Sequence, residues 1–185
     1  DEIRRKSEEK DAENLEFRRL MRSKHLPEEP FHLLAAEVSK EIDCTTCANC
    51  CRMTLVSVTS EDVKRIAGFL ECSSDEVIQR YTSMDLEVTG GRILRQVDGA
   101  CIFLRENRCT IYEARPKPCR DFPHTEIRER SLGGRMASQC LRASICPIVY
   151  NTLERYKRLV GYRTRRSHRR SRPANPDATG FSQQE

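Results

Sequence analysis

Ten cysteines in a chain of 185 residues constrain this protein more than any other feature of its sequence. Four of them fall within eight residues, in the pattern C-x2-C-x2-C-C formed by Cys44, Cys47, Cys50 and Cys51. A two-residue spacer allows a tight turn to direct two sulfurs at one ion, about 2.3 Å from each. This segment therefore predicts a site at which cysteine thiolates bind metal.

The other cysteines lie farther along the chain. They form a group with the pattern C-x7-C-x9-C, a pair with the pattern C-x5-C, and a single residue: Cys101, Cys109 and Cys119; Cys140 and Cys146; and Cys72. We expect the first group and Cys146 to bind metal, and Cys72 to be a small buried hydrophobic residue. The sequence leaves the role of Cys140 open.

Cys50 and Cys51 are neighbours in the chain, and adjacent side chains point apart in most backbone conformations. They therefore need not bind the same ion. One can face a first metal while the other faces a second site or the core. The sequence thus predicts one or two metal centres.

The rest of the composition explains why metal would matter for folding. Hydrophobic residues make up 37% of the chain, charged residues make up 33%, and there is no tryptophan. Such a chain buries a thin core for its length, and metal–thiolate bonds can supply the folding energy that the core lacks. We therefore predict a small α+β domain of short helices and a hairpin, pinned by cysteines around its metal.

The compartment decides between metal and disulfides, the two common uses of clustered cysteines. Residues 1–24 are charged and lack the apolar stretch of a secretory signal, and no run approaches the roughly 18 apolar residues of a membrane span. We therefore expect an intracellular protein in a reducing compartment, without a membrane partner. The chain begins with Asp1 rather than methionine, so organelle targeting by a removed segment stays open.

Local patterns predict a helical first half. Apolar residues recur at spacings of three and four from Phe31 to Ile42, which is typical of an amphipathic helix. Thr59 and Ser73 are each followed by acidic residues and an apolar stripe, as N-caps of helices are. We therefore expect helices to begin at these two positions.

In the second half, the turn dipeptide Asp98-Gly99 separates two short runs, residues 92–97 and 100–104, and predicts a β-hairpin. Gly133-Gly134 is interpreted as a flexible loop. Cys146-Pro147 is interpreted as the start of a terminal helix, because proline suits the first helical position.

These patterns divide the chain into a charged N-terminal extension over residues 1–29, a cysteine-rich metal-binding domain over 30–161, and a disordered basic tail over 162–185. The segment from Arg163 to Arg172 carries six arginines and no acid. Such a run can bind the phosphates of a nucleic acid. We favour a solvated extension, since no aromatic base-stacking platform accompanies the arginines.

The cysteine spacing leaves two metal chemistries open. A zinc-type site would be structural or chelating. The cluster also partly resembles ferredoxin spacing, in which C-x2-C-x2-C is completed by a remote Cys-Pro. In that alternative the protein is an iron–sulfur redox or protein-modifying enzyme, with cluster ligands that include Cys44, Cys47, Cys50 and Cys146.

The sequence identifies no catalytic residue. No histidine stands in a recognisable arrangement with a cysteine, and His124 is interpreted as a surface residue. The glycine pairs lack the spacing of a phosphate- or dinucleotide-binding loop. Whether the chain is an enzyme therefore stays open; the expected partner is a metal ion, and the expected cofactor is zinc or iron, with an iron–sulfur cluster as one form.

Arginines stand beside several of the predicted ligands. Arg115 and Arg120 flank Cys119, and Arg52 follows Cys51. Four thiolates around a divalent ion leave a net charge of about −2, and a buried net charge needs partners. These arginines are candidates to hold and tune the sulfur ligands; the alternative is that they are only solvated.

The cysteine cluster, a pair of helices and the stretch ACIFLRENRCTIYEARPKPCRDFP together resemble the CxxCxxCC family of zinc- or iron-chelating domains, also called flagellin N-methylase-like. The resemblance covers roughly residues 44–150 and implies metal binding. It implies ligands at Cys44, Cys47, Cys50, Cys51, Cys101, Cys109 and Cys119, and at a later cysteine that Cys146 matches best. Ala48 stands where the family often has glycine. The methylase activity is not carried over, because the sequence contains no visible pocket for S-adenosylmethionine.

Overall fold

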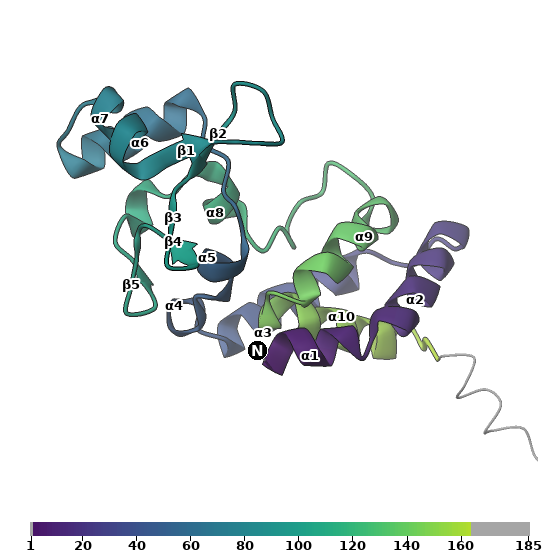
Figure 1. Ribbon diagram of the computed structural model, residues 1–185. Coiled ribbons are helices and arrows are strands. Elements are labelled where there is room, and N and C mark those ends of the chain that lie inside the picture. Colours follow the sequence, from purple (N-terminus) through teal and green to yellow (C-terminus); the bar gives the residue numbers. More distant parts are fainter. Residues whose placement is uncertain (1, 164–185) are drawn as a thin grey trace, which may run out of the picture.

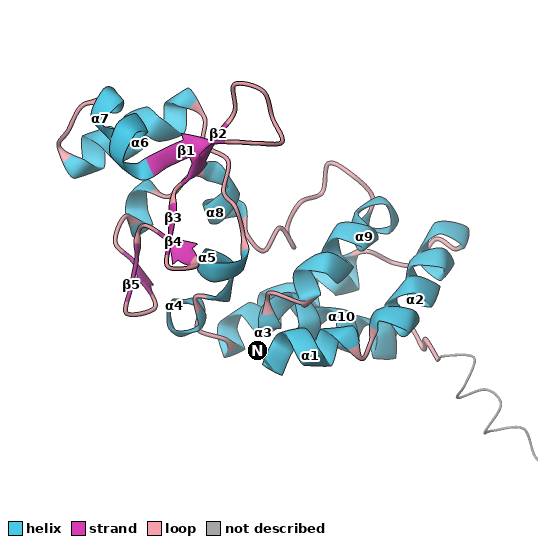
Figure 2. Ribbon diagram, in the orientation of Figure 1, coloured by secondary structure: helices cyan, strands magenta, loops and turns pink. Residues whose placement is uncertain are grey.

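The computed structural model describes residues 2–163, which form two lobes joined by a short segment that carries the cysteine cluster (Figure 1). Figure 2 shows that helices dominate and that the strands are short and confined to one lobe. This arrangement confirms the predicted α+β class. We call the two parts the helical lobe and the hairpin lobe, and residues 44–53 the cysteine segment.

The helical lobe combines the two ends of the described chain. Its elements are α1 (Glu2–Glu8), α2 (Asp11–Ser23), α3 (Glu29–Glu41), α9 (Leu132–Ala143) and α10 (Pro147–Leu159). Helix α10 packs against both α3 and α9, and α2 packs against α9. The sequence expectations of a helix after Phe31 and of a terminal helix after Cys146 are confirmed.

Aromatic side chains fill the core of the helical lobe. Phe31 meets Tyr156 edge to face, with ring centroids 5.5 Å apart, and Phe17 meets Tyr156 at 6.1 Å. The Tyr156 hydroxyl donates a hydrogen bond to the Pro27 carbonyl at 2.8 Å, so its one polar group is satisfied. Residues 1–29, expected as a charged extension, thus place Phe17 and Met21 in the same core as Phe31.

The expectation of a flexible loop at Gly133-Gly134 is wrong, because both glycines lie in the first turn of α9. The Ser131 hydroxyl caps this helix by accepting a hydrogen bond from the Gly134 N–H at 3.2 Å. A Cβ at residue 133 would approach the Met21 carbonyl oxygen to 2.9 Å. The glycine therefore permits close contact between α9 and α2, a tertiary requirement with no local signature.

The hairpin lobe contains the middle of the chain. Its elements are α6 (Ser60–Leu70), α7 (Ser74–Tyr81), β1 (Thr82–Met84), β2 (Arg92–Leu94), β3 (Gln96–Val97), β4 (Ala100–Cys101), β5 (Leu104–Arg105), β6 (Arg108–Cys109), the 3-10 helix η1 (Tyr112–Ala114) and α8 (Lys117–Asp121). The strands pair as three antiparallel ribbons, β1 with β2, β3 with β4 and β5 with β6. Thr59 and Ser73 cap α6 and α7 as predicted.

Two tight turns shape the end of this lobe that carries cysteines. Asp98 and Gly99, which join β3 to β4, have φ values of 51° and 74°. Glu106 and Asn107, which join β5 to β6, have φ values of 47° and 65°. Two consecutive residues with positive φ match the twist of paired strands, as hairpin turns require. The predicted hairpin at Asp98-Gly99 is confirmed, although its strands are only two residues long.

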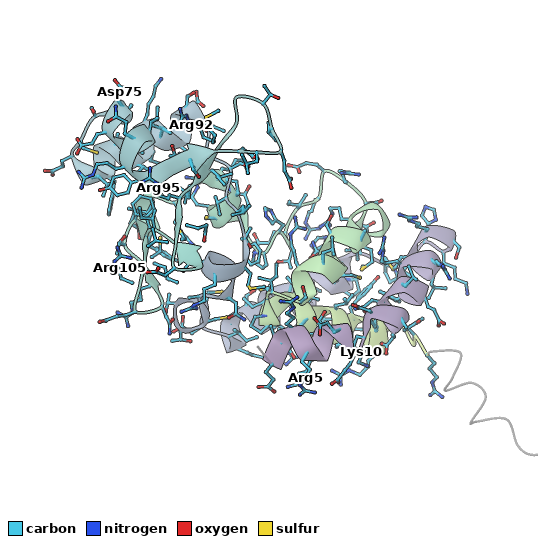
Figure 3. The ribbon with its side chains drawn as sticks, in the orientation of Figure 1. Arg5, Lys10, Asp75, Arg92, Arg95 and Arg105 are labelled. Atoms are coloured by element: carbon cyan, nitrogen blue, oxygen red, sulfur yellow. The ribbon has the colours of Figure 1, made fainter. Side chains whose placement is uncertain are left out.

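Charged side chains cover the outside of both lobes (Figure 3). Some of them also fix backbone. Arg95 donates hydrogen bonds to the carbonyls of Gln79 at 2.6 Å and Thr82 at 3.3 Å, and Arg92 donates to the Thr82 hydroxyl at 3.2 Å. These contacts hold the β1–β2 ribbon to the end of α7.

The cysteine segment contains two very short helices, α4 (Cys44–Cys47) and α5 (Asn49–Met53), where the sequence predicts a loop or tight turn. Ala48 joins them with φ of 51°, the left-handed region that favours glycine. Figure 1 shows α4 and α5 between the hairpin lobe and the start of the helical lobe. The segment is therefore placed to offer cysteines to both lobes.

Two sequence expectations concern the rest of the chain. No helix within residues 2–163 is long and apolar enough to cross a membrane. The predicted disordered tail, residues 162–185, lies outside the described residues except for Tyr162 and Arg163.

Candidate metal centre

Six of the eight predicted ligands line one cavity of about 420 Å³ at the face of the hairpin lobe that meets the cysteine segment. They are Cys44, Cys50, Cys51, Cys101, Cys109 and Cys119. All ten cysteines are free thiols. The cavity therefore gathers sulfur ligands from positions up to 75 residues apart in the sequence, from residue 44 to residue 119.

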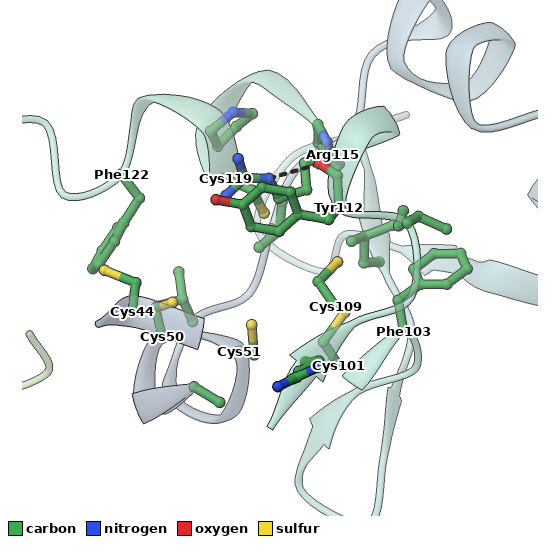
Figure 4. Close-up of a pocket in the computed structure, with 18 of the residues that line it drawn as sticks. Cys44, Cys50, Cys51, Cys101, Phe103, Cys109, Tyr112, Arg115, Cys119 and Phe122 are labelled. Atoms are coloured by element: carbon green, nitrogen blue, oxygen red, sulfur yellow. Dashed lines mark hydrogen bonds between the residues drawn. The ribbon is translucent and has the colours of Figure 1, made fainter. Parts of the chain in front are cut away.

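Four of these cysteines come from four different elements of the hairpin side. Cys51 lies in α5, Cys101 ends β4, Cys109 ends β6 and Cys119 lies in α8. Helix α5 packs against β4, and α4 packs against β6. Figure 4 shows the Cys51 side chain directed toward Cys101 and Cys109, with Cys119 above them. The two tight hairpins are what place Cys101 and Cys109 side by side.

The remaining four predicted ligands are divided between the cavity and its surroundings. Cys44 and Cys50 line the cavity, and Figure 4 shows Cys44 turned toward Phe122 with Cys50 between Cys44 and Cys51. Cys47 and Cys146 do not line the cavity. Cys146 immediately precedes α10 and is 5% exposed, in the core of the helical lobe.

Burial makes the thiolate forms of these cysteines costly. It raises the pKa of Cys101 to about 11 and that of Cys119 to about 12. It also raises the pKa of Cys146 to about 11. Neighbouring thiols add to the effect, because two thiolates in a half-buried site repel one another. At neutral pH, a nearby positive charge would therefore favour the ionised form of these sulfurs.

Cys50 and Cys51 interact with each other. A hydrogen bond between their thiols raises the pKa of Cys50 and lowers that of Cys51, so the proton stays on Cys50. Arg52 and Arg115 lower the pKa of Cys51 further. Cys51 is therefore the most readily ionised thiol of this pair.

Backbone N–H groups also favour the sulfur anions. Hydrogen bonding from the Phe103 N–H opposes the raised pKa of Cys101, and the Ile111 N–H acts in the same way on Cys109. Each donor lies two residues after its cysteine, where the chain leaves a strand. Hydrogen bonds of this kind to a sulfur ligand orient it and stabilise its charge.

Arg115 is the cation that acts on the largest number of these thiols. It opposes the burial that raises the pKa values of Cys44, Cys109 and Cys119, and it contributes to the lowered pKa of Cys51. Its guanidinium stacks on the Tyr112 ring at 3.6 Å from the centroid, and its Nε donates to the Tyr112 carbonyl at 2.8 Å. The expectation that arginines balance the sulfur charge thus has a structural basis at Arg115.

Arg52 has a different task, because it connects the cysteine segment to the hairpin lobe. Its guanidinium donates to the Cys47 carbonyl at 3.4 Å and to the side-chain oxygen of Asn107 in the β5–β6 turn. It therefore fixes the segment against the hairpin that carries Cys109.

Asp62 positions Cys119 from a distance, and the one local signal of this role is an acid in the first turn of α6. Its carboxylate is 2% exposed and accepts hydrogen bonds from the Lys117 N–H at 3.0 Å and from Arg65. Arg65 in turn donates to the Arg115 carbonyl at 2.9 Å. One buried carboxylate thus caps α6 and also holds the turn that begins α8.

Three residues outside the predicted ligand set have clear places. Cys72 packs against the hairpin-lobe core, in line with the expected role as a small hydrophobic residue. Cys140 packs against the helical-lobe core, apart from the cavity. His124, expected at the surface, is half-buried and lines the cavity, and burial lowers its pKa.

The chemistry of the donors fits a thiophilic metal, although the side chains are not closed around one. Within residues 2–163, no group of three or more Cys, His, Asp or Glu side chains is arranged to hold a metal ion as it stands. Thiolate sulfur is nevertheless the donor that zinc and iron–sulfur centres prefer. A bound metal ion would supply a positive charge that favours the thiolate forms of these buried cysteines.

Comparisons with known proteins agree with this reading of the residues. The profile of the family described as "CxxCxxCC: Putative zinc- or iron-chelating domain" matches residues 43–146. "Uncharacterized protein MJ0661" of Methanocaldococcus jannaschii is 38% identical over 92 residues, 48% of this chain and 48% of that protein. The chain thus spans about half the length of this relative. No solved structure matches significantly. The family profile covers more than half of the chain, and the protein therefore belongs to the CxxCxxCC family of zinc- or iron-chelating domains.

Proposed function

We propose that this protein binds zinc or iron through the eight cysteines named above, and that the metal joins segments of the chain that would otherwise be weakly held. The single observation that carries the proposal is the convergence of six free thiols on one cavity. Sequence-distant cysteines rarely converge unpaired without a shared ligand. Family membership supports the same class of ligand.

The chain's own residues supply what a thiolate–metal site requires. The cysteines provide soft sulfur donors, and each must lose its proton to bind. Arg115 and the N–H groups of Phe103 and Ile111 favour the ionised form. Asp62 and Arg65 hold the turn before Cys119. The bound metal would supply the positive charge that makes buried thiolates stable and would link the segments covalently.

An iron–sulfur centre is the second candidate, and one observation favours it. A cavity of about 420 Å³ with six thiols on its wall has more room than one mononuclear ion needs. The spacing of Cys44, Cys47 and Cys50, with Cys146-Pro147 remote in sequence, is also close to a ferredoxin pattern. A cluster would give the protein redox or protein-modifying chemistry.

The test is to purify the full chain without air and to measure zinc, iron and acid-labile sulfide per chain, together with the visible spectrum. A colourless protein with zinc supports a structural or chelating module. Iron with matching sulfide and a broad visible band that bleaches on reduction supports the second candidate. A chain that contains no metal, and takes up neither zinc nor iron when they are supplied, contradicts the proposal.

A further inference from the structure

We infer that the eight cysteines form two separate four-cysteine sites, one within the hairpin lobe and one that joins the two lobes. The hairpin-lobe set is Cys51, Cys101, Cys109 and Cys119. The interlobe set is Cys44, Cys47, Cys50 and Cys146. This inference rests on the proposed metal binding and adds the number of centres, their ligands and their different structural roles.

Packing assigns the hairpin-lobe set. All four of its cysteines are buried in, or pack against, the core formed by residues such as Val63, Ile66 and Leu94. All four also line the cavity. In Figure 4 the Cys51 side chain extends from the cysteine segment toward the two hairpin cysteines, and Cys119 closes the group from α8. Three members of the set therefore belong to the hairpin lobe, and Cys51 joins them from the cysteine segment.

Packing assigns Cys146 to the other set. It is buried in the helical-lobe core and lies outside the cavity. Cys44 and Cys50 lie at the edge of the cavity, and Figure 4 shows Cys44 turned toward Phe122, which packs against the same helical-lobe core as Cys146. A metal held by Cys146 together with the cysteine segment would therefore connect α10 to a segment that also contacts the hairpins.

The adjacent pair Cys50 and Cys51 explains how one five-residue helix serves both sites. Consecutive residues on a helix are turned about 100° from each other, so their sulfurs can face different centres. The doubled cysteine is thus the position at which the C-x2-C-x2-C-C pattern divides between the two proposed sites. In this assignment its first three cysteines join Cys146, and its fourth joins the hairpin cysteines.

The experiment uses the full-length chain, freed of metal and titrated with Co²⁺ alone under anaerobic conditions. Bound cobalt is counted by elemental analysis and native mass spectrometry, and thiolate ligation is read from the sulfur-to-cobalt charge-transfer band. We expect two ions per wild-type chain. Cys109→Ser and Cys44→Ser should each retain one ion, and the double variant should retain none. Cys72→Ser is the matched control and should retain two.

A second readout separates the structural roles and does not depend on metal counting. Arg128 and Arg130 are exposed in the connection between α8 and α9, where trypsin can cut if the lobes separate. We expect Cys44→Ser and Cys146→Ser, each loaded with cobalt, to be cut there at least tenfold faster than wild type. Cys109→Ser should be cut first inside residues 92–120 instead. Circular dichroism of each variant checks that the helices remain.

The outcomes distinguish the two claims. A wild-type chain that binds no cobalt contradicts metal binding itself. One ion per wild-type chain, or loss of all cobalt in every single-site variant except Cys72→Ser, leaves metal binding intact and overturns the division into two sites. Retention of two ions in Cys44→Ser or Cys109→Ser overturns the assignment of that residue.

Discussion

The two lobes reach stability by different routes. The four longer helices of the helical lobe have 12 or 13 residues, and aromatic side chains such as Phe31 and Tyr156 pack together in its core. The hairpin lobe has strands of two or three residues, and four of the predicted ligands lie in or against its core. A two-stranded ribbon is at best marginally stable alone. We therefore expect packing to suffice for the first lobe, and the proposed ligation to stabilise the second.

Metal removal should produce the largest difference in stability between the two lobes. After chelation under reducing conditions, we expect residues 92–120 to lose most of their protection from amide hydrogen exchange, because structural metal sites contribute folding energy directly. Helices α3 and α10 should keep most of theirs. Exchange measured segment by segment by mass spectrometry checks this. Equal protection in both lobes before and after chelation would show that metal does not support the hairpins.

A substitution that creates a cavity in the helical core should produce the opposite pattern, with the helical lobe destabilised and metal binding in the hairpin lobe unchanged. Leu153 is 1% exposed, and Leu153→Ala should lower the free energy of unfolding of the helical lobe by about 2–5 kcal/mol. Cobalt binding by the hairpin-lobe set should stay unchanged. Leu141→Ala is the control, since Leu141 is 73% exposed. Denaturant unfolding measures the loss, and equal effects of the two variants would contradict the assigned core.

Asp62→Asn should weaken the hairpin lobe without touching a cysteine. The amide keeps an oxygen but loses the charge that pairs with Arg65 and accepts the Lys117 N–H. We expect a loss of about 1–3 kcal/mol in unfolding free energy, because a buried hydrogen-bonding network is disturbed. Cobalt affinity at the Cys119 site should fall about tenfold. Glu61→Gln, the neighbouring exposed acid, should change neither quantity in a competition titration.

The smallest effect should be an acid sensitivity confined to the helical lobe. Burial raises the pKa of Glu13, but hydrogen bonds from Lys157 and Lys10 outweigh burial and hold it below its ordinary value of 4.5. A carboxylate with a lowered pKa contributes stability above its unfolded pKa and loses it as pH falls through the folded one.

Glu13→Gln should therefore cost about 1 kcal/mol at pH 7 and progressively less below pH of about 4.5. Thermal unfolding of both proteins between pH 7 and pH 3 measures the difference. Glu16→Gln on the same helix serves as the control. A penalty for Glu13→Gln that stays constant over this range would exclude the ion pair with Lys157 as its cause.

Much of the site could be predicted because its signals are local. The doubled cysteine after two C-x2-C steps, the Asp98-Gly99 turn and the Thr59 cap each depend on a few neighbouring residues, and each appears where expected. The expectation that Cys50 and Cys51 need not share one ion also follows from adjacency alone. It stays a prediction until metals are counted.

The interpretation of Gly133-Gly134 as a loop failed because its cause is not local. A glycine pair in isolation favours a loop, but here Gly133 lies in a helix against the Met21 carbonyl of a helix more than a hundred residues earlier. The packing of residues 1–29 into the helical core was hidden in the same way. A dense run of mixed charges conceals the few apolar residues that α9 and α10 cover.

The sequence alone therefore determined the kind of ligand, because cysteine spacing and turn chemistry act over a few residues. Only the tertiary structure decided which cysteines lie together. Cys101 and Cys109 lie near the cysteine segment because β4 packs against α5 and β6 packs against α4. Cys119 and Cys51 line the same cavity, whereas Cys146 lies in the core of the helical lobe. Grouping of distant side chains depends on the packing of whole elements, and no spacing along the chain encodes that packing.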